Sequence, residues 1–122
     1  MVRVLIVDDQ PYFRRVAREL LALRGYAVVG EAGCAASAHD AARRLRPDAV
    51  LLDVCLGADD GHDVARALAR LDPRPAVLMV SITDHGDEDV RARDCGARGF
   101  LLKTSIASAD LGRFWPSPSA GA

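Results

Sequence analysis

Four apolar runs in this chain each stop at a polar residue. The runs span residues 2–7, 49–52, 76–80 and 100–102. Short runs of β-branched and aliphatic residues are typical of buried strands in a parallel sheet. Ligand sites in open α/β sheets form at the carboxyl edge, where such strands end. The polar residues that follow the four runs are therefore candidates for one shared site: Asp8, Asp9, Asp53, Ser81 and Lys103.

Strand and helix patterns alternate from one end of the chain to the other. A further strand is expected at residues 27–30, and helical patterns separate the five strands. Such alternation indicates a doubly wound α/β fold with a five-stranded parallel sheet, most simply in the order 2-1-3-4-5. In that order the ends of strands 1, 3, 4 and 5 are neighbours. Glu31, at the end of strand 2, is expected to lie outside the cluster.

The last part of the chain is expected to be less regular than the first. The helical pattern over residues 87–95 contains few apolar residues. Ser108 can cap a final helix, but Gly112 interrupts that helix and Pro116 must end it. We therefore expect a shortened last helix of about two turns. The sequence predicts one domain over residues 1–115 and a disordered Pro/Ser tail over residues 116–122.

Composition excludes several classes of partner. The 122 residues carry a net charge of −1, which gives no footprint for direct nucleic-acid binding or for an anionic membrane. No stretch approaches the ~18 apolar residues of a membrane span. Three cysteines without metal-type spacing favour reduced thiols and a cytoplasmic location. His39, His62 and His85 show no ligand spacing with a cysteine and are predicted to lie on the surface.

The residues predicted at the sheet edge suit one divalent cation and one phosphoryl group. Magnesium prefers hard oxygen ligands, and two or three carboxylates are a suitable number. A carboxylate can also act as a nucleophile and form an aspartyl phosphate. A lysine ammonium and a serine hydroxyl can contact further phosphoryl oxygens. Each residue alone has an ordinary structural explanation, but their joint occurrence at four strand ends favours the functional interpretation.

The ordered motifs VLIVDDQ, VLLDVCL followed by DDG, VLMVSIT and GARGFLLKT carry a family resemblance. Over residues 2–111 the chain resembles the receiver domain of bacterial two-component response regulators. It is most similar to receivers that precede helix-turn-helix output domains. The resemblance implies a phospho-accepting switch that takes its phosphoryl group from a histidine kinase, with Mg²⁺ as cofactor, and not a turnover enzyme.

The resemblance also implies a role for each site residue. Asp53 is implied as the phospho-acceptor. Asp9 would ligate magnesium directly and Asp8 through water, while the backbone carbonyl of Cys55 would be a further ligand. The acceptor carboxylate of Asp53 completes this expected metal-binding set.

Three further roles follow from the same resemblance. Lys103 would contact the phosphoryl group, and Ser81 would move to bond it. Phe100 would change rotamer as the switch aromatic, although a phenylalanine on a strand is more often plain core. A histidine kinase or phosphotransfer protein would be the upstream partner, with a protein as a possible downstream partner.

The chain departs from the family pattern at several positions. Gly57 stands where a proline is usual, and Thr104 stands where a cis proline often follows the lysine. Ile82 could crowd the path of Ser81. Because the fourth and fifth helices are weak, we expect a monomer or a weak dimer.

Three other functions stay open at this point. The site could be vestigial and the fold a phosphorylation-independent interaction module. The chain could be the receiver piece of a longer DNA-binding regulator. A phosphatase with an aspartate nucleophile is disfavoured, because such enzymes need a second carboxylate where Cys55 stands.

Overall fold

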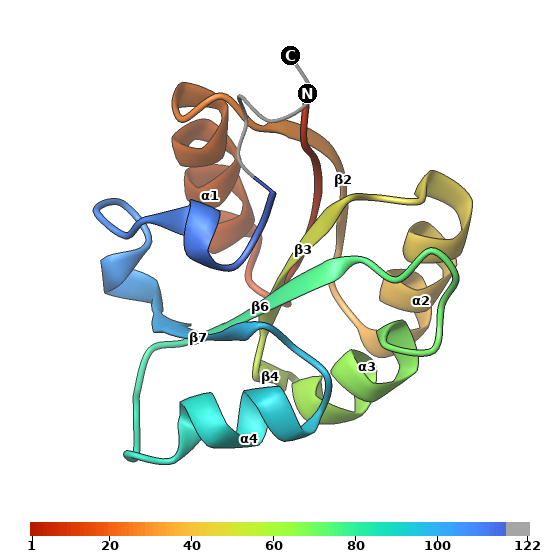
Figure 1. The fold of residues 1–122 in the computed structure, drawn as a ribbon, viewed down its shortest axis with the longest axis vertical. Coiled ribbons are helices and arrows are strands. Elements are labelled where there is room, and N and C mark those ends of the chain that lie inside the picture. Colours follow the sequence, from red (N-terminus) through yellow and green to blue (C-terminus); the bar gives the residue numbers. More distant parts are fainter. Residues whose placement is uncertain (117–122) are drawn as a thin grey trace.

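The computed structural model describes residues 1–116 as a parallel sheet between two layers of helical and irregular segments (Figure 1). The five strands of the sheet lie in the order β2-β1-β3-β6-β7. They are β1 (Arg3–Val7), β2 (Ala27–Ala32), β3 (Ala49–Asp53), β6 (Ala76–Ser81) and β7 (Gly99–Leu102). Every pairing between them is parallel. The predicted doubly wound fold and strand order are confirmed.

Within residues 1–116, four α-helices cover the two faces of the sheet. They are α1 (Pro11–Leu23), α2 (Ala35–Leu45), α3 (Gly61–Leu68) and α4 (Glu88–Asp94). Figure 1 shows α1 on one side of the sheet with the C-terminal segment, and the other three helices on the opposite side. Two hydrophobic cores correspond to these two sides.

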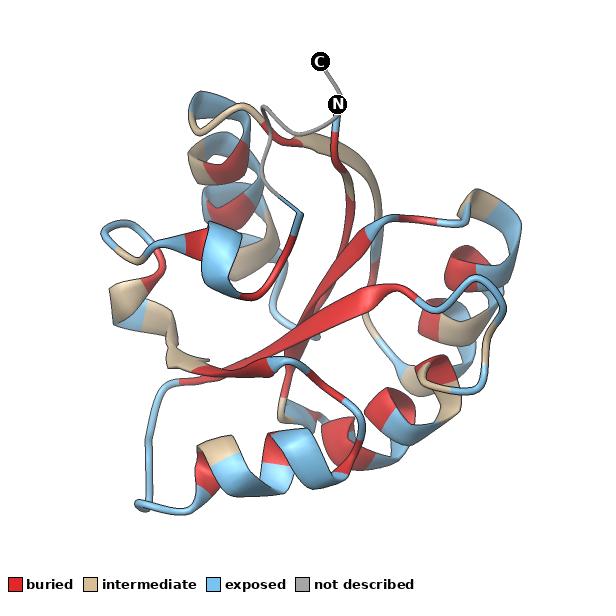
Figure 2. Ribbon diagram, in the orientation of Figure 1, coloured by how far each residue is buried: buried red, intermediate tan, exposed pale blue. Residues whose placement is uncertain are grey.

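The strands supply both cores because their side chains alternate between the two faces. Leu5 and Val7 belong to the core under α2, α3 and α4, whereas Val4 and Ile6 belong to the core under α1. All four are fully buried. Figure 2 shows this burial along the central strands. Continuous apolar runs are what a sheet covered on both faces requires.

The predicted two-turn final helix does not form. Two 3₁₀ turns follow β7 instead, η1 (Lys103–Ser105) and η2 (Leu111–Arg113). Ser108 does not cap the second turn; the carboxylate of Asp110 accepts from the Gly112 amide at 3.1 Å. Glycine is costly inside a helix, so this segment forms one short turn instead of two helical ones.

Apolar side chains from this irregular segment nevertheless fill one core. Leu111 and Trp115 are buried, and the Trp115 ring meets Tyr26 edge-on at 5.4 Å between centroids. The Arg24 guanidinium, at the end of α1, donates to the Ile106 carbonyl at 2.8 Å and to the Ala109 carbonyl. The segment is therefore held by side-chain burial and by an arginine that satisfies its main chain.

The segment after β3 contains a short antiparallel hairpin. Its strands are β4 (Cys55–Leu56) and β5 (Asp59–Asp60). Gly57 begins the turn with a φ of +62°, in the left-handed region. Proline, with φ near −65°, cannot adopt that conformation. A proline at position 57 would therefore require a different turn.

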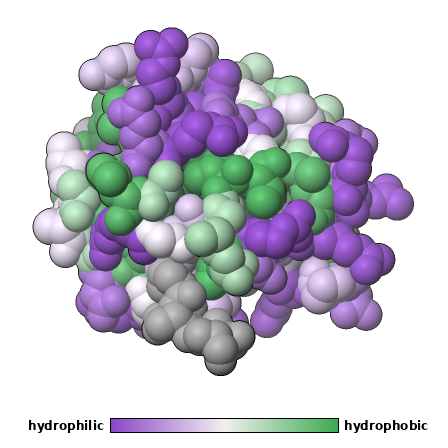
Figure 3. All heavy atoms as spheres, turned by 90° about the horizontal axis from the view of Figure 1, so that it is seen from above, coloured by the Kyte–Doolittle hydropathy of each residue, from purple (hydrophilic) through white to green (hydrophobic). Residues whose placement is uncertain are grey.

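The surface carries both polar and apolar side chains. On the face shown in Figure 3, a band of hydrophobic residues crosses between hydrophilic ones. Across residues 1–116, the helices are all too short or too polar to cross a membrane. Of the predicted disordered tail, residues 117–122 lie outside the described part of the chain.

Candidate functional site

Three carboxylates meet at the carboxyl edge of the sheet. Asp8 directly follows β1, Asp53 is the last residue of β3, and these two central strands are paired side by side. Asp8, Asp9 and Asp53 each offer a carboxylate oxygen, and the three oxygens lie within 4.8 Å of one another. Asp8 and Asp53 are buried, whereas Asp9 is exposed. The predicted convergence of these residues is seen in the structure.

Lys103 reaches the same carboxylates from the end of β7. Its Nζ lies 2.7 Å from Asp8 Oδ2 and 3.1 Å from Asp53 Oδ2. The ammonium also lies over the Phe13 ring, 4.2 Å from the ring centroid. Only 9% of the lysine side chain is exposed. The ion pairs and the aromatic face together hold the ammonium in the site.

The buried charged groups of this cluster shift one another's pKa values. Burial and the neighbouring Asp8 charge raise the pKa of Asp53, against the opposing effects of the Cys55 amide and of Lys103. Burial alone would lower the pKa of Lys103, but the two carboxylates raise it. The lysine therefore stays charged, and its charge compensates part of the repulsion between the aspartates.

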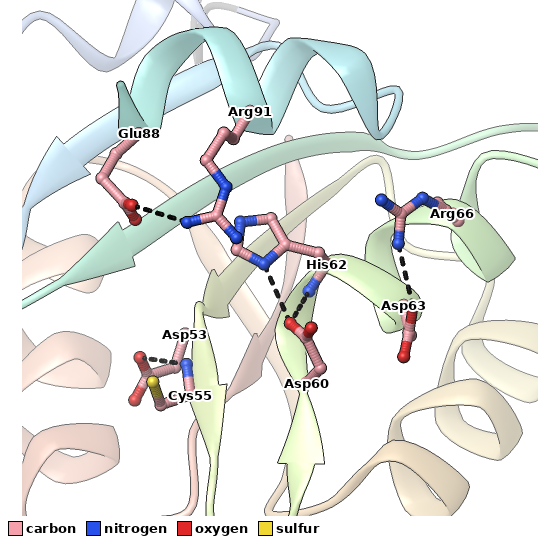
Figure 4. Close-up of polar contacts among 8 residues, drawn as sticks. All are labelled: Asp53, Cys55, Asp60, His62, Asp63, Arg66, Glu88 and Arg91. Atoms are coloured by element: carbon pink, nitrogen blue, oxygen red, sulfur yellow. Dashed lines mark hydrogen bonds and ion pairs between the residues drawn. The ribbon is translucent and has the colours of Figure 1, made fainter. Parts of the chain in front are cut away.

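The two oxygens of Asp53 have different partners. Oδ1 accepts from the Cys55 amide at 3.1 Å, and Oδ2 accepts from Lys103 (Figure 4 shows the first contact). Cys55 belongs to the hairpin, so the hairpin backbone helps to orient the carboxylate. The Cys55 thiol is exposed.

Ser81 and Phe100 lie on the strands next to this cluster. Ser81 ends β6, one residue beyond Val80, the residue that pairs with Asp53. Its Oγ accepts from the Thr83 amide at 3.3 Å. Phe100, on β7, is 7% exposed and belongs to the hydrophobic core. Ile82 is 76% exposed, and the crowding of the path of Ser81 stays a prediction.

Glu31 lies outside the acidic cluster, as predicted, but it has a role that the sequence did not reveal. Its carboxylate pairs with Arg14 Nε at 3.0 Å and with Arg18 Nε at 2.8 Å. Arg14 and Arg18 are therefore tied to β2 and are not freely solvated on α1. The helical spacing of the arginines could be read from the sequence, but their partner on a separate strand could not.

His62 was predicted on the surface, and the structure places it in the interior. It is 4% exposed, and its Nδ1 lies 2.9 Å from Asp60 Oδ1 (Figure 4). The same carboxylate accepts from the His62 amide and so caps α3. Asp60 caps α3, and the first turn of this helix places the His62 side chain toward the interior. In the sequence, the only indication of this burial was Asp60, two residues before the histidine.

A second polar pair lies at a cavity beside the acidic cluster. Glu88, in the first turn of α4, is 4% exposed and accepts from Arg91 at 3.2 Å (Figure 4). A cavity of about 390 Å³ lies between the hairpin, the loop after β6 and α4; Cys55, Ser81 and Thr83 contribute to its lining. The site thus opens toward the start of α4.

The residues present fit a magnesium ion. All three acidic side chains offer hard oxygen atoms, the ligand type that this ion prefers. In residues 1–116, the Lys103 ammonium, 2.7 Å away, is the one donor recorded at the Oδ2 atom of buried Asp8. Lone pairs are therefore available at the centre of the cluster.

A family model for the response regulator receiver domain matches residues 4–111. Over 104 residues the chain is 41% identical to the nitrate/nitrite response regulator protein NarP of Escherichia coli, covering 84% of this chain and 48% of that protein. It is 35% identical to the response regulator GacA of Pseudomonas aeruginosa, covering 84% and 49%. The chain thus spans about half the length of these relatives.

Solved structures agree with the sequence relatives. The signal receiver domain of the putative response regulator NarL from Mycobacterium tuberculosis matches with a TM-score of 0.80 and 38% identity, covering 88% of this chain and 87% of that one. A response regulator from Burkholderia pseudomallei, with a phosphorylated aspartic acid and a calcium ion, matches with a TM-score of 0.84 and 25% identity, covering 98% and 69%.

Proposed function

This chain belongs to the response regulator receiver domain family, and on that premise we propose that it accepts a phosphoryl group on Asp53 from a histidine kinase or phosphotransfer protein. In this proposal the chain acts as a signalling switch and not as a turnover enzyme. The observation that carries the proposal is the pairing of Asp53 with Lys103, 3.1 Å apart, inside a cluster of three carboxylates.

Asp53 is the nucleophile in this proposal. One of its carboxylate oxygens attacks phosphorus, and the bond between phosphorus and the donor breaks as the aspartyl phosphate forms. Oδ1 is oriented by the Cys55 amide. Lys103 supplies a positive charge beside the acceptor, where a phosphoryl group brings negative charge. Ser81 is positioned one residue beyond the neighbour of Asp53 to donate to a phosphoryl oxygen.

Magnesium is the proposed cofactor. Asp8, Asp9 and Asp53 would hold the ion, with the backbone carbonyl of Cys55 as a further ligand. The bound ion would supply neutralisation of the charge on the phosphoryl oxygens.

We assign the conformational response to Ser81 and Phe100. Phosphorylation adds about −1.5 to −2 charge at Asp53. To bond that group, the Ser81 hydroxyl would leave its contact with the Thr83 amide. The cavity beside Ser81 and Thr83 gives this loop room to move. Phe100, packed near α4 with its amide donating to Asp89 Oδ1 at 3.2 Å, would follow by changing rotamer.

The remaining parts of the proposal concern partners and location. We place the protein in the cytoplasm, upstream of a protein target, with no direct binding to nucleic acid. The final helix is replaced by 3₁₀ turns and α4 has only seven residues, so this face lacks a continuous helical surface. A monomer or a weak dimer is therefore expected, and light scattering over a concentration series tests this.

Intact-protein mass spectrometry after incubation with acetyl phosphate and Mg²⁺ tests the phosphoryl transfer. The wild type should gain one phosphoryl mass, and Asp53→Asn should gain none. Asp63→Asn is a matched control, because Asp63 lies exposed on α3 in an ion pair with Arg66. It should label like the wild type. The adduct should also disappear in EDTA.

The opposite result would support a vestigial receiver. No adduct on the wild type, under conditions that label a second receiver in the same tube, would refute the proposed phosphoryl transfer. The unmodified fold would then be tested for a protein partner.

A further inference from the structure

The peptide group between Asp8 and Asp9 is bound by an arginine from α1. Arg14 Nη1 donates to the Asp8 carbonyl at 2.5 Å. The Nε of the same guanidinium donates to Glu31 Oε1, on β2, at 3.0 Å. One planar group therefore joins the end of β1 to the neighbouring edge strand. This bridge uses two N–H groups of one planar guanidinium, whose fixed fork a lysine ammonium does not have.

Two neighbours keep this guanidinium in place. Glu31 uses its other oxygen to accept from Arg18 at 2.8 Å, so the carboxylate is held between two arginines. Partial burial alone would raise the pKa of Glu31, but the hydrogen bonds from Arg18 and Arg14 lower it, so the carboxylate stays ionised. At Gly33 a Cβ would lie 3.4 Å from Arg14 Nη1, so a larger side chain would press on the guanidinium.

The two aspartates are held in different ways. The Asp8 side chain is buried, and its Oδ1 accepts from the Gln10 amide at 2.9 Å. Asp9 is exposed, and within residues 1–116 its carboxylate takes part in no side-chain hydrogen bond or ion pair. The direction of the Asp9 side chain therefore depends on its backbone, and the Asp8–Asp9 peptide is where Arg14 binds that backbone.

We propose that Arg14 is a positioning residue for the cation site: anchored by Glu31, it sets the Asp8–Asp9 peptide so that Asp9 faces the other two carboxylates. The inference rests on the proposed function, because it assumes that the three aspartates hold a divalent cation. Groups that orient the ligands of a metal typically change its affinity about 10- to 100-fold when they are removed.

The charge of Arg14 cannot explain such an effect. A positive charge near the cluster disfavours a cation, so its removal would strengthen binding if charge dominated. If geometry dominates, removal weakens binding. Arg14→Lys separates the two cases, because it keeps the charge and loses the fork.

The test is the affinity for Mn²⁺, measured as the free ion by electron paramagnetic resonance, with Mg²⁺ in competition. We expect Arg14→Lys and Arg14→Gln to bind about 10-fold more weakly than the wild type. Arg15→Gln is the matched control, since Arg15 is the next residue on α1 and is exposed. Arg18→Gln removes the partner that touches Glu31 but not Asp8, and should change affinity less than threefold, on the order of a weak surface pair.

A second readout separates positioning from a general loss of structure. The Mg²⁺ concentration for half-maximal labelling by acetyl phosphate should rise about 10-fold in both Arg14 variants, with the maximal rate at saturating Mg²⁺ within about twofold of wild type. Thermal unfolding in EDTA should stay close to wild type. If either variant unfolds, Glu31→Gln replaces it, because that change keeps Arg14 and weakens its anchor.

The outcomes distinguish this inference from the proposed function. If Arg14→Lys binds Mn²⁺ as tightly as the wild type, or more tightly, the positioning role is refuted even when Asp53 is still labelled. If the wild type itself binds no Mn²⁺ and is not labelled, the proposed function fails, and the role of Arg14 fails with it.

Discussion

The first and the second half of this protein build the same site with different amounts of helix. Residues before the end of β3 include α1 with 13 residues and α2 with 11, and they supply Asp8, Asp9 and Asp53. Residues from the start of β6 onward include α4 with seven residues and, in place of a final helix, two 3₁₀ turns. This half still delivers Ser81 and Lys103 to the sheet edge.

The comparison shows that the site depends on the ends of strands and on burial, and less on helix length. Strand β7 is held by its parallel pairing with β6, and the core beneath it is closed by Ile106, Leu111 and Trp115. Apolar area removed from water stabilises a fold whether or not the chain that carries it is helical. An irregular segment can therefore replace a helix if its large side chains are buried.

The largest effect on stability should come from removing a buried side chain of the irregular C-terminal segment. Trp115→Ala removes a side chain that is 3% exposed, and should reduce the free energy of unfolding by about 3–5 kcal/mol. Denaturant unfolding followed by circular dichroism measures the change. Leu23→Ala, at an 89% exposed position on α1, should change it by less than about 0.5 kcal/mol. Similar values for both would mean that the C-terminal segment contributes little.

A change at the start of α3 tests how closely the chain packs around the acceptor Asp53. A Cβ at Gly61 would overlap the carbonyl oxygen of Asp53 and lie 2.6 Å from that of Val54. Gly61→Ala should therefore cost about 1–3 kcal/mol and slow labelling of Asp53, since backbone at the acceptor must shift. In Gly112→Ala the new Cβ meets only the Asp110 side chain, at 3.2 Å. Equal labelling rates in both variants would argue against tight coupling at the acceptor.

The hairpin turn offers a smaller and more selective test. Gly57→Ala places a side chain at a φ of +62°, which costs about 1–2 kcal/mol. Gly86, with a φ of +96° and open space around it, is the matched control. Both variants should lose similar stability. Only Gly57→Ala should also change Mn²⁺ binding, because its Cβ would lie in van der Waals contact with Asp9 Oδ2, at 3.5 Å, beside the proposed metal site.

The smallest expected effect is the pH-dependent contribution of Glu31, on β2, to stability. The pKa of Glu31 is lowered from 4.5 in the folded protein, so its ion pairs stabilise the fold above that pH and are lost as the pH falls through the folded pKa. Glu31→Gln should cost about 0.5–1 kcal/mol at pH 7 and nothing once the pH is well below the folded pKa of Glu31. Urea unfolding at several pH values checks this, with exposed Glu19→Gln as control. A constant difference at all pH values would contradict an electrostatic origin.

The sequence predicted the parts of this molecule that depend on local pattern. Apolar runs located the strands, and the polar residues at their ends located Asp8, Asp9, Asp53 and Lys103 at one edge. The Lys103–Thr104 peptide, which the missing proline left in question, is trans.

Features that depend on distant partners were not predicted. The hairpin around Gly57 has strands of only two residues, too short for a periodic pattern. The burial of His62 and the contact of Glu31 with Arg14 need three-dimensional proximity between separate elements. Helical spacing also suggested a final helix, where one glycine and a carboxylate cap produce a 3₁₀ turn instead.

The position of Lys103 has a consequence for how the site responds to salt. Its ammonium, 2.7 Å from Asp8 and 3.1 Å from Asp53, acts as a built-in counterion for the two buried carboxylates. Because this counterion is covalently attached, it is not released into solution when a divalent ion arrives, and added sodium does not replace it. Buried pairs are also screened far less than exposed ones. For the proposed magnesium site, the dependence of cation affinity on ionic strength should therefore report mainly on exposed Asp9.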